Sequence, residues 1–160
     1  MSFRTEKDLF ETALNSSYFQ QLVNQAVFLI EPQGLFGVPD LVVAHIKLSK
    51  AKERVRVQKT MAFEMKLHNW KRALVQAFRY QAFATMSFVV LDDAYIQRAT
   101  KHLEKFQIAN IGLLSINKQG VVISHYFPRP NEPYSVQLRV TFNHMLLASA
   151  ELRCPESAFE

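Results

Sequence analysis

The sequence predicts an α/β fold in which helices cover a central mixed β-sheet. Three observations support this prediction. Short apolar runs typical of strands alternate with segments whose apolar residues recur every three or four positions, as on one face of a helix. The composition, 49% hydrophobic and 21% charged, is ordinary for a globular protein. With no internal repeat and no Gly/Ser-rich linker, residues 1–160 are expected to form a single domain.

The N-terminal segment is expected to form a helix and then a strand. Thr5 and Asp8 have the spacing of a capping box, so a helix should begin near Thr5 and run to Asn15 or as far as Leu22. The apolar run 26–30 ends at a Pro-Gln-Gly turn, which predicts a short strand.

Two further strands are expected over residues 38–46 and 55–66. The second alternates between apolar and polar side chains, which is the pattern of a strand with one buried face. Strict alternation places on that face Val55, Val57, Met61, Phe63 and Met65. Glu64 and Lys66 should then share the opposite face.

A helix should follow directly, opening near Asn69. Its apolar face is expected to consist of Trp70, Ala73, Leu74, Ala77, Phe78 and Gln81. Its opposite side would carry Arg72, Gln76, Arg79 and Tyr80.

The C-terminal half should complete the fold. Residues 87–91 form a continuous apolar run typical of a fully buried strand. Asp92 or Asp93 would cap a helix that extends through Phe106. The remaining expected elements are a hairpin of strands 111–116 and 121–127 and a final helix over residues 136–147.

Basic residues exceed acidic ones by nineteen to fourteen, and the net charge of +5 suits a polyanionic partner. Part of the excess is local, since six basic residues and one acid lie between Lys47 and Lys59. Two interpretations remain open for this segment. It is either a solvated hairpin or an arm whose Lys52, Arg54 and Arg56 contact phosphates.

Several function classes lack support in the sequence. No apolar run approaches the ~18–20 residues that cross a bilayer, and the charged N-terminus does not resemble a signal peptide, so we expect a cytoplasmic protein without a membrane partner. Cys154 is the single cysteine. The five histidines lack metal-ligand spacing, and neither a Gly-x-Ser-x-Gly nor a phosphate-binding glycine loop is present.

Two acids and one lysine form the candidate site. Asp40 lies early in an otherwise apolar strand, where a carboxylate is costly unless something compensates it. Glu64 has the same problem at the end of its strand, and Lys66 points to the same side two residues later. If the two strands are neighbours, these three groups converge.

This set suits the hydrolysis of phosphodiester bonds. The carboxylates of Asp40 and Glu64, with the main-chain carbonyl of Met65, would bind Mg²⁺, for which Mn²⁺ can substitute. Lys66 would position the attacking water or stabilise the developing negative charge. Each fragment alone also fits a surface ion pair or an ordinary turn, but their order and placement together favour a site.

Gly37–Val42 (GVPDLV) together with Phe63–Lys66 (FEMK) resembles the signature of the PD-(D/E)XK nuclease superfamily. The resemblance extends from about Glu6 to Leu91. It implies a restriction-endonuclease-like fold and a metal-dependent nuclease. The 24 residues from Asp40 to Glu64 are a long separation, which the basic hairpin can absorb.

The resemblance also implies supporting residues. The helix after Lys66 is similar to a segment that in many members supplies a supporting Gln, which here is Gln76. An acid on the helix before the first core strand would be Glu6, with Glu11 as the second choice. Glu31 is a further candidate for the metal shell, and His68 could face the site.

The same helix also offers Arg72, Arg79 and Tyr80, which would either line a substrate groove or form a solvated helix face. We therefore expect an endonuclease that hydrolyses DNA. The alternatives are a non-catalytic nucleic-acid-binding module with the same fold and a nuclease that cleaves RNA. A homodimer is possible because the final helix is apolar on more than one side.

Overall fold

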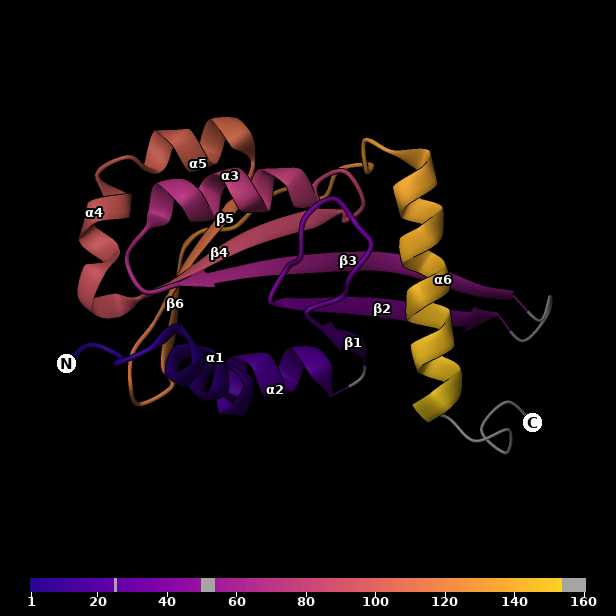
Figure 1. Cartoon of the computed structure of the whole chain (residues 1–160), viewed down its shortest axis with the longest axis horizontal. Helices are drawn as coiled ribbons and strands as arrows, with labels where there is room; N and C mark the ends of the chain where they lie inside the picture. Colours follow the sequence, from indigo (N-terminus) through magenta and orange to yellow (C-terminus); the bar gives the residue numbers. More distant parts are fainter. Residues whose placement is uncertain (25, 50–53, 154–160) are drawn as a thin grey trace.

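Six strands form one mixed β-sheet at the centre of the protein (Figure 1). The computed structural model describes residues 1–24, 26–49 and 54–153. In their order across the sheet, the strands are β1 (Val27–Ile30), β2 (Leu41–Ser49), β3 (Arg54–Lys66), β4 (Met86–Asp92), β5 (Gly112–Ile116) and β6 (Val122–Tyr126). Strands β3, β4 and β5 run parallel, whereas the other neighbours pair antiparallel. The predicted α/β fold with a central mixed sheet is confirmed.

Helices cover both faces of this sheet. One face carries α1 (Glu6–Asn15) and α2 (Ser17–Val23), and the other carries α3 (Trp70–Tyr80), α4 (Ile96–Thr100) and α5 (Leu103–Ala109) (Figure 1). The short helix η1 (Asp93–Tyr95) joins β4 to α4, and α6 (Val136–Arg153) ends the described chain. Within the described residues, no helix has both the length and the apolar surface that a membrane crossing requires.

The hydrophobic core lies in two layers, one on each face. On the α1–α2 side, the ring of Phe63 stacks on Phe88 and meets Phe19 edge-on, with ring centroids 4.8 and 5.1 Å apart. On the α3 side, Phe142 and Leu146 of α6 are buried in the same cluster as the apolar residues of α3. Burial of α6 against the fold accounts for part of its apolar surface without a second copy of the chain.

The first predicted helix is divided at Ser16. The backbone of Ser16 is extended, with ψ of 151°, and its hydroxyl accepts a hydrogen bond from Phe19 N–H. Ser16 therefore ends α1 and caps α2, since a serine side chain can replace a helical backbone bond at this position. The predicted capping box of Thr5 and Asp8 is confirmed.

A β-bulge overturns the strict alternation predicted for residues 55–66. His45 pairs with Lys59, but the next residue, Ile46, pairs with Val57, so β3 contains one extra residue at Gln58. Because of the extra residue, side chains before and after the bulge do not follow one strict alternation between the two faces of the sheet. Val57 therefore packs in the α3 layer, whereas Met61, Phe63 and Met65 pack in the α1–α2 layer.

The buried face of α3 is also rotated relative to the prediction. Tyr80, predicted on the outer side, is 1% exposed, and Phe78, predicted on the inner side, is 50% exposed. The tyrosine is tolerated inside because its hydroxyl finds partners there, as described below. Asn69 caps this helix as predicted.

Other boundaries differ by less. The second strand begins at Leu41, three residues later than expected, so Asp40 precedes the strand. The helix expected through Phe106 is divided into η1, α4 and α5 after the Asp92 cap, and the final helix continues to Arg153. The predicted C-terminal hairpin is confirmed as β5 and β6.

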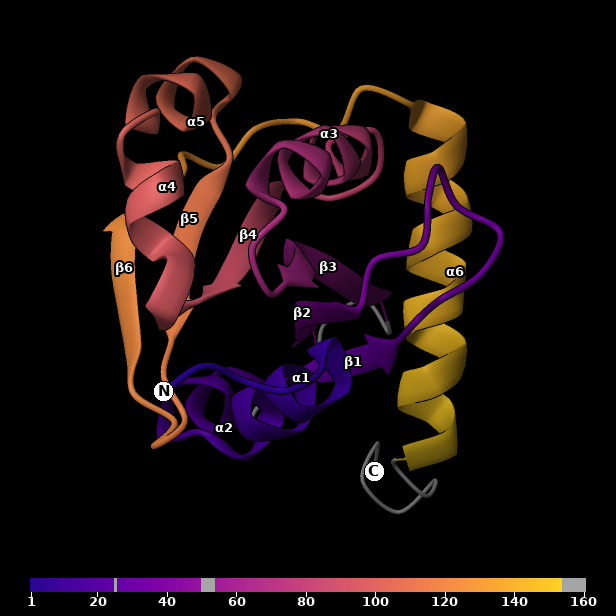
Figure 2. The same cartoon turned by 60° about the vertical axis from the view of Figure 1, so that its left-hand side comes forward.

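The loop between β1 and β2 rises beside α6 (Figure 2), and it requires glycine at two positions. Gly34 and Gly37 have positive φ angles of 86° and 87°. A Cβ on Gly37 would lie 3.0 Å from the Tyr80 ring, whereas one on Gly34 would meet nothing within 4 Å. The loop therefore closes directly over Tyr80.

We expect Gly37→Ala to lower the free energy of unfolding more than Gly34→Ala does. Both variants bear the cost of a left-handed backbone, roughly 1–2 kcal/mol. Only Gly37→Ala must also displace the Tyr80 ring, which should add about 1 kcal/mol. Urea unfolding of both variants measures the difference. Equal losses would show that the loop does not press on Tyr80.

Candidate functional site

The candidate site lies where β3 ends beside the start of β2. Asp40 N–H donates to the carbonyl of Phe63 at 3.0 Å, which extends the β2–β3 pairing by one step. The Asp40 carboxylate in turn accepts a hydrogen bond from Met65 N–H at 2.6 Å. This bond fixes the Asp40 carboxylate on the backbone between Glu64 and Lys66. The convergence predicted from the sequence is therefore present in the structure.

Lys66 connects two acids from different elements. Its Nζ lies 3.3 Å from Glu64 Oε1 and 3.3 Å from Glu6 Oε2, and its side chain is 17% exposed. Glu6 comes from the first turn of α1. Glu11, the alternative to Glu6, is directed elsewhere, since it lies 3.9 Å from Lys7 and lines a different hollow.

Tyr80 holds the second oxygen of Glu64. The Tyr80 hydroxyl lies 2.5 Å from Glu64 Oε2 and 3.0 Å from the carbonyl oxygen of Val38. Because one hydroxyl has one proton, it donates to Glu64 while Glu64 is ionised. If Glu64 is protonated, it can donate to Tyr80, which then donates to Val38. Tyr80 thus contacts the site from inside the fold, and its burial excludes direct contact with a substrate groove.

Burial raises the pKa of two carboxyl groups at the site. For Asp40, burial and then the charge of Glu64 raise the pKa to about 7, although the Met65 N–H and Lys66 oppose the shift. Burial also raises the pKa of Glu64, which is 2% exposed, against the hydrogen bond from Tyr80 and the charge of Lys66. Two neighbouring carboxylates therefore resist simultaneous ionisation.

The pKa values of Lys66 and Tyr80 are raised as well. Burial by itself lowers the pKa of Lys66, but the charges of Glu64 and Glu6 outweigh it and raise the pKa above its ordinary value. Burial, followed by the hydrogen bond to Glu64, raises the pKa of Tyr80. At neutral pH, Lys66 is consequently an ammonium ion and Tyr80 a neutral donor.

A cavity of about 410 Å³ opens next to these groups. Asp40, Met65 and Glu6 line it, together with Glu31 of the loop that follows β1. Glu31 has a positive φ of 46°, and its N–H donates to the carbonyl of Asp40. Of the three acids considered for a metal shell besides Asp40 and Glu64, Glu6 and Glu31 thus reach this cavity.

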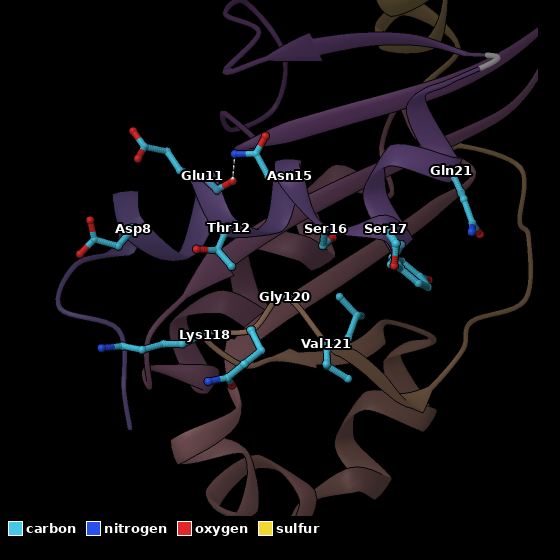
Figure 3. Close-up of a pocket in the computed structure, with 13 residues that line it drawn as sticks. Asp8, Glu11, Thr12, Asn15, Ser16, Ser17, Gln21, Lys118, Gly120 and Val121 are labelled. Atoms are coloured by element: carbon cyan, nitrogen blue, oxygen red, sulfur yellow. Dashed lines mark hydrogen bonds between the residues drawn. The ribbon is translucent and has the colours of Figure 1, made fainter.

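A larger hollow of about 870 Å³ lies between the α1–α2 junction and the β5–β6 turn (Figure 3). Glu11, Asn15 and Lys118 are among its lining residues, and Asn15 donates to the carbonyl of Glu11. Its lining does not include Asp40, Glu64 or Lys66. We place the candidate site at the smaller cavity because Asp40, whose pKa is raised by burial and by Glu64, lines it.

The residues of the site fit a hard divalent cation. Carboxylate oxygens are the ligands that Mg²⁺ prefers, and the raised pKa values show two acids that a nearby cation would stabilise in the ionised form. Gln76 Oε1, on α3 one turn before Tyr80, is buried and lacks a hydrogen-bond partner in the described part of the chain. An orphaned acceptor of this kind is costly unless a donor or cation meets it.

The donor set does not form a closed metal cage. Among residues 1–24, 26–49 and 54–153, no three His, Cys, Asp or Glu side chains gather as a metal cluster. One or two carboxylates completed by water and phosphate oxygens are the usual environment of Mg²⁺. The Met65 carbonyl remains a predicted ligand.

The predicted nucleic-acid contacts are only partly described. Lys52 lies outside the described residues, and Arg54 is described only as the first residue of β3. Arg56, Arg72 and Arg79 are exposed. The paired strands β2 and β3 form the predicted basic hairpin, whose contact with phosphates stays a prediction.

His68 does not join the site through any described contact. It is exposed, and its ring meets Tyr95 edge-on with centroids 5.5 Å apart. Tyr80 was predicted to line a substrate groove or a solvated helix face, and its bond to Glu64 was not predicted. The available signal was the four-residue spacing of Gln76 and Tyr80, which places both on one side of α3.

Comparisons with known proteins bear on the fold alone. No family model matches the chain, and no curated protein matches it. Among solved structures, a protein of unknown function from Silicibacter pomeroyi is similar, with a TM-score of 0.50 and 14% identity over 81% of this chain and 77% of that chain. At this identity the likeness concerns the arrangement of helices and strands, so function has to be argued from the site.

We expect the Asp40 carboxyl group to make the metal-free protein less stable as the pH rises. The folded state holds this proton up to about pH 7, whereas the unfolded chain releases it near pH 4. Between these values the folded state binds more protons, so the contribution of Asp40 falls with rising pH. Asp40→Asn, which mimics the protonated acid, should gain about 1–2 kcal/mol over the natural chain between pH 5 and pH 8.

Urea unfolding in EDTA at pH 5 and at pH 8 measures how the difference in free energy of unfolding between Asp40→Asn and the natural chain changes with pH. Asp8→Asn, at the exposed capping box, provides a comparison acid outside the site. If the free energies of unfolding of Asp40→Asn and the natural chain differ by the same amount at both pH values, the raised pKa of Asp40 is contradicted.

Removal of the Tyr80 hydroxyl should destabilise the fold. Tyr80→Phe leaves Oε2 of the buried Glu64 carboxylate without its donor, which should cost about 1–3 kcal/mol. Tyr134→Phe is the matched control, because the Tyr134 hydroxyl also bonds a side chain, Gln81 Oε1 at 3.1 Å, but its ring is largely exposed. Thermal unfolding of both variants provides the measurement. Similar losses in the two would mean that the bond to Glu64 carries no special weight.

Proposed function

We propose that the protein is a metal-dependent endonuclease that hydrolyses phosphodiester bonds of DNA on a restriction-endonuclease-like fold. The observation that carries the proposal is the convergence of Asp40, Glu64 and Lys66 beside an acid-lined cavity. Two carboxylates with raised pKa values and one ammonium group are expensive to keep together in a partly buried place. A catalytic use explains that cost better than a structural one, since apolar residues would stabilise the same strand ends.

The arrangement of the elements supports the finer fold assignment. Asp40 lies directly before β2 and Glu64 near the end of β3, and these two strands are antiparallel neighbours. Helix α3 follows Lys66 directly and leads into β4, which lies parallel to β3. This is the order that the resemblance to the PD-(D/E)XK superfamily implies for the segments bearing its motif.

Each residue of the site has a defined task in this proposal. Asp40 and Glu64 would hold Mg²⁺, which supplies Lewis-acid activation of a phosphate and of a water molecule. Lys66, fixed as an ammonium ion by its acidic neighbours, stabilises the negative charge that develops on the phosphate oxygens. It is not a proton acceptor, because its pKa is raised.

Tyr80 and Glu6 act on the orientation of these groups. The Tyr80 hydroxyl restrains Glu64, and its raised pKa keeps it a hydrogen-bond donor throughout the neutral range. Glu6 draws Lys66 toward α1. Gln76, with its unpartnered buried oxygen, is the further residue to which we assign a supporting role.

Nicking of supercoiled plasmid with Mg²⁺ or Mn²⁺ tests the proposal. Asp40→Asn, Glu64→Gln and Lys66→Met should each reduce the rate by about 100-fold or more, because each removes charge that is needed at the reacting phosphate. Glu11→Gln is the matched control, since Glu11 lies on the same helix as Glu6 but outside the site. EDTA should abolish nicking.

Two outcomes would contradict the proposal. Equal nicking by the natural chain and by Glu64→Gln would indicate a contaminating nuclease. DNA binding without any nicking in Mg²⁺ or Mn²⁺ would favour the non-catalytic module. A parallel assay on RNA of the same sequence decides between the two kinds of nucleic acid.

A further inference from the structure

An exposed cluster of aromatic and basic side chains surrounds the C-terminal end of α3. Its aromatic members are Phe36, Phe78 and Tyr134, which are 52%, 50% and 67% exposed. Phe36 belongs to the loop between β1 and β2, and Tyr134 to the segment before α6. Three segments far apart in the sequence therefore bring large rings to one surface, which we call the aromatic rim. Large exposed rings that gather near one helix end are candidates for a binding surface.

The rings of the rim contact one another or a cation. The guanidinium carbon of Arg79 lies 5.7 Å from the centroid of the Phe36 ring, within the range of a cation–π interaction. The rings of Phe78 and Tyr134 lie 6.4 Å apart at an angle of 49°. Each pair thus buries part of one ring face and leaves the remaining surface open to solvent.

Hydrogen bonds hold the rim in place. Tyr134 N–H donates to the carbonyl of Gln81, its hydroxyl bonds Gln81 Oε1, and Ser135 N–H donates to the carbonyl of Ala82. Gly37, next to Phe36, lies against the ring of Tyr80. A ring fixed in this way loses little conformational freedom when it binds a ligand, which favours affinity.

The rim is connected to the candidate site through Tyr80. The same tyrosine meets the Phe36 loop with its ring and with its bond to Val38, and it meets Glu64 with its hydroxyl. Tyr80 therefore joins the loop that carries Phe36 to the carboxylate of Glu64. A ring that is exposed for reasons unrelated to the site would not need to lie on a loop that contacts Tyr80.

The charge of α3 selects a polyanion as the occupant. Its outward side presents Lys71, Arg72, Val75, Phe78 and Arg79, all exposed. The eleven residues of the helix include three basic residues and no acid. Basic groups alternating with apolar ones match a strand of nucleic acid, whose phosphates meet cations while its bases meet rings.

We propose that the aromatic rim binds an unpaired stretch of DNA, with bases stacked on Phe36, Phe78 and Tyr134 and phosphates near Arg72 and Arg79. Exposed rings favour unpaired over duplex DNA, because in a duplex the base faces are already stacked on each other. The inference rests on the proposed nuclease function. It narrows the substrate to DNA that contains single-stranded segments, such as flaps, gaps or ends.

Fluorescence anisotropy with labelled oligothymidylate of about 12 nucleotides, a length within known single-strand sites, tests this inference. The measurement is made on the full chain in EDTA, so that binding is independent of cleavage. We expect Phe36→Ala, Phe78→Ala and Tyr134→Ala each to weaken binding by roughly 5- to 100-fold. Tyr134→Phe, which keeps the ring and loses only the hydroxyl bond to Gln81, should weaken binding much less than Tyr134→Ala does.

Ile108→Ala is the matched control, since Ile108 is an exposed apolar residue of α5 outside the rim. Annealing the complementary strand to the probe should weaken binding, and the effect of the three alanine variants on duplex binding should be small. Circular dichroism of each variant confirms that the fold is retained.

Three results would overturn the inference. One is oligothymidylate binding that the alanine variants leave unchanged. Another is tighter binding of an oligouridylate of the same length, which would assign the rim to RNA. The third is the absence of oligonucleotide binding together with self-association that the alanine variants abolish, which would assign the rim to a second copy of the chain.

The failure of this inference is distinguishable from failure of the proposed function. If the natural chain nicks plasmid but the alanine variants bind oligothymidylate as tightly as it does, only the proposed DNA binding at the rim is contradicted. Ring-dependent binding without cleavage of either plasmid or a duplex that carries a gap or flap, in Mg²⁺ or Mn²⁺, would contradict only the nuclease activity.

Discussion

The arrangement of the site depends on a single buried carboxylate, that of Glu64. At 2% exposure it has lost its hydration, and an uncompensated charge in such a place would be costly. Lys66 meets one of its oxygens and Tyr80 the other. These two contacts impose conditions on distant parts of the chain, since β3 must end in the correct register and α3 must turn Tyr80 inward. The glycine loop must also close over the tyrosine ring, which explains why Gly37 is placed against it.

Much of this arrangement could be predicted from patterns in the sequence. Apolar runs and turn residues predicted the strands and the order of the elements, and the placement of Asp40 near Glu64 followed once β2 and β3 were assumed to pair. The bulge at Gln58 could not be predicted, because its cause is the pairing with His45 and Ile46 across the sheet and not a local signal. The bulge did not affect the prediction for Glu64 and Lys66, since both lie beyond it.

The roles of Tyr80 and Glu6 show a different limit. A helical wheel sorts side chains by polarity, so it placed Phe78 inside and Tyr80 outside, whereas a specific partner for the hydroxyl reversed the two. Glu6 and Glu11 lie on one helix, and only the position of α1 relative to β3 decides that Glu6 meets Lys66. Contacts with residues of another helix or strand depend on the tertiary structure, so local sequence patterns do not predict them.

The electrostatics of the site also constrain the order of events in the proposed reaction. The chain carries a net charge of +5, which would attract DNA at long range. At the site, however, Glu64 and Glu6 pair with the Lys66 ammonium group, and Asp40 adds a third acid nearby. A phosphate that approached this cluster without a cation would meet a local excess of negative charge. In the proposed reaction, the basic surface of α3 would therefore hold DNA in the absence of metal, whereas placing a phosphate beside Glu64 would require a divalent cation first. Binding and cleavage should consequently separate when the metal is removed.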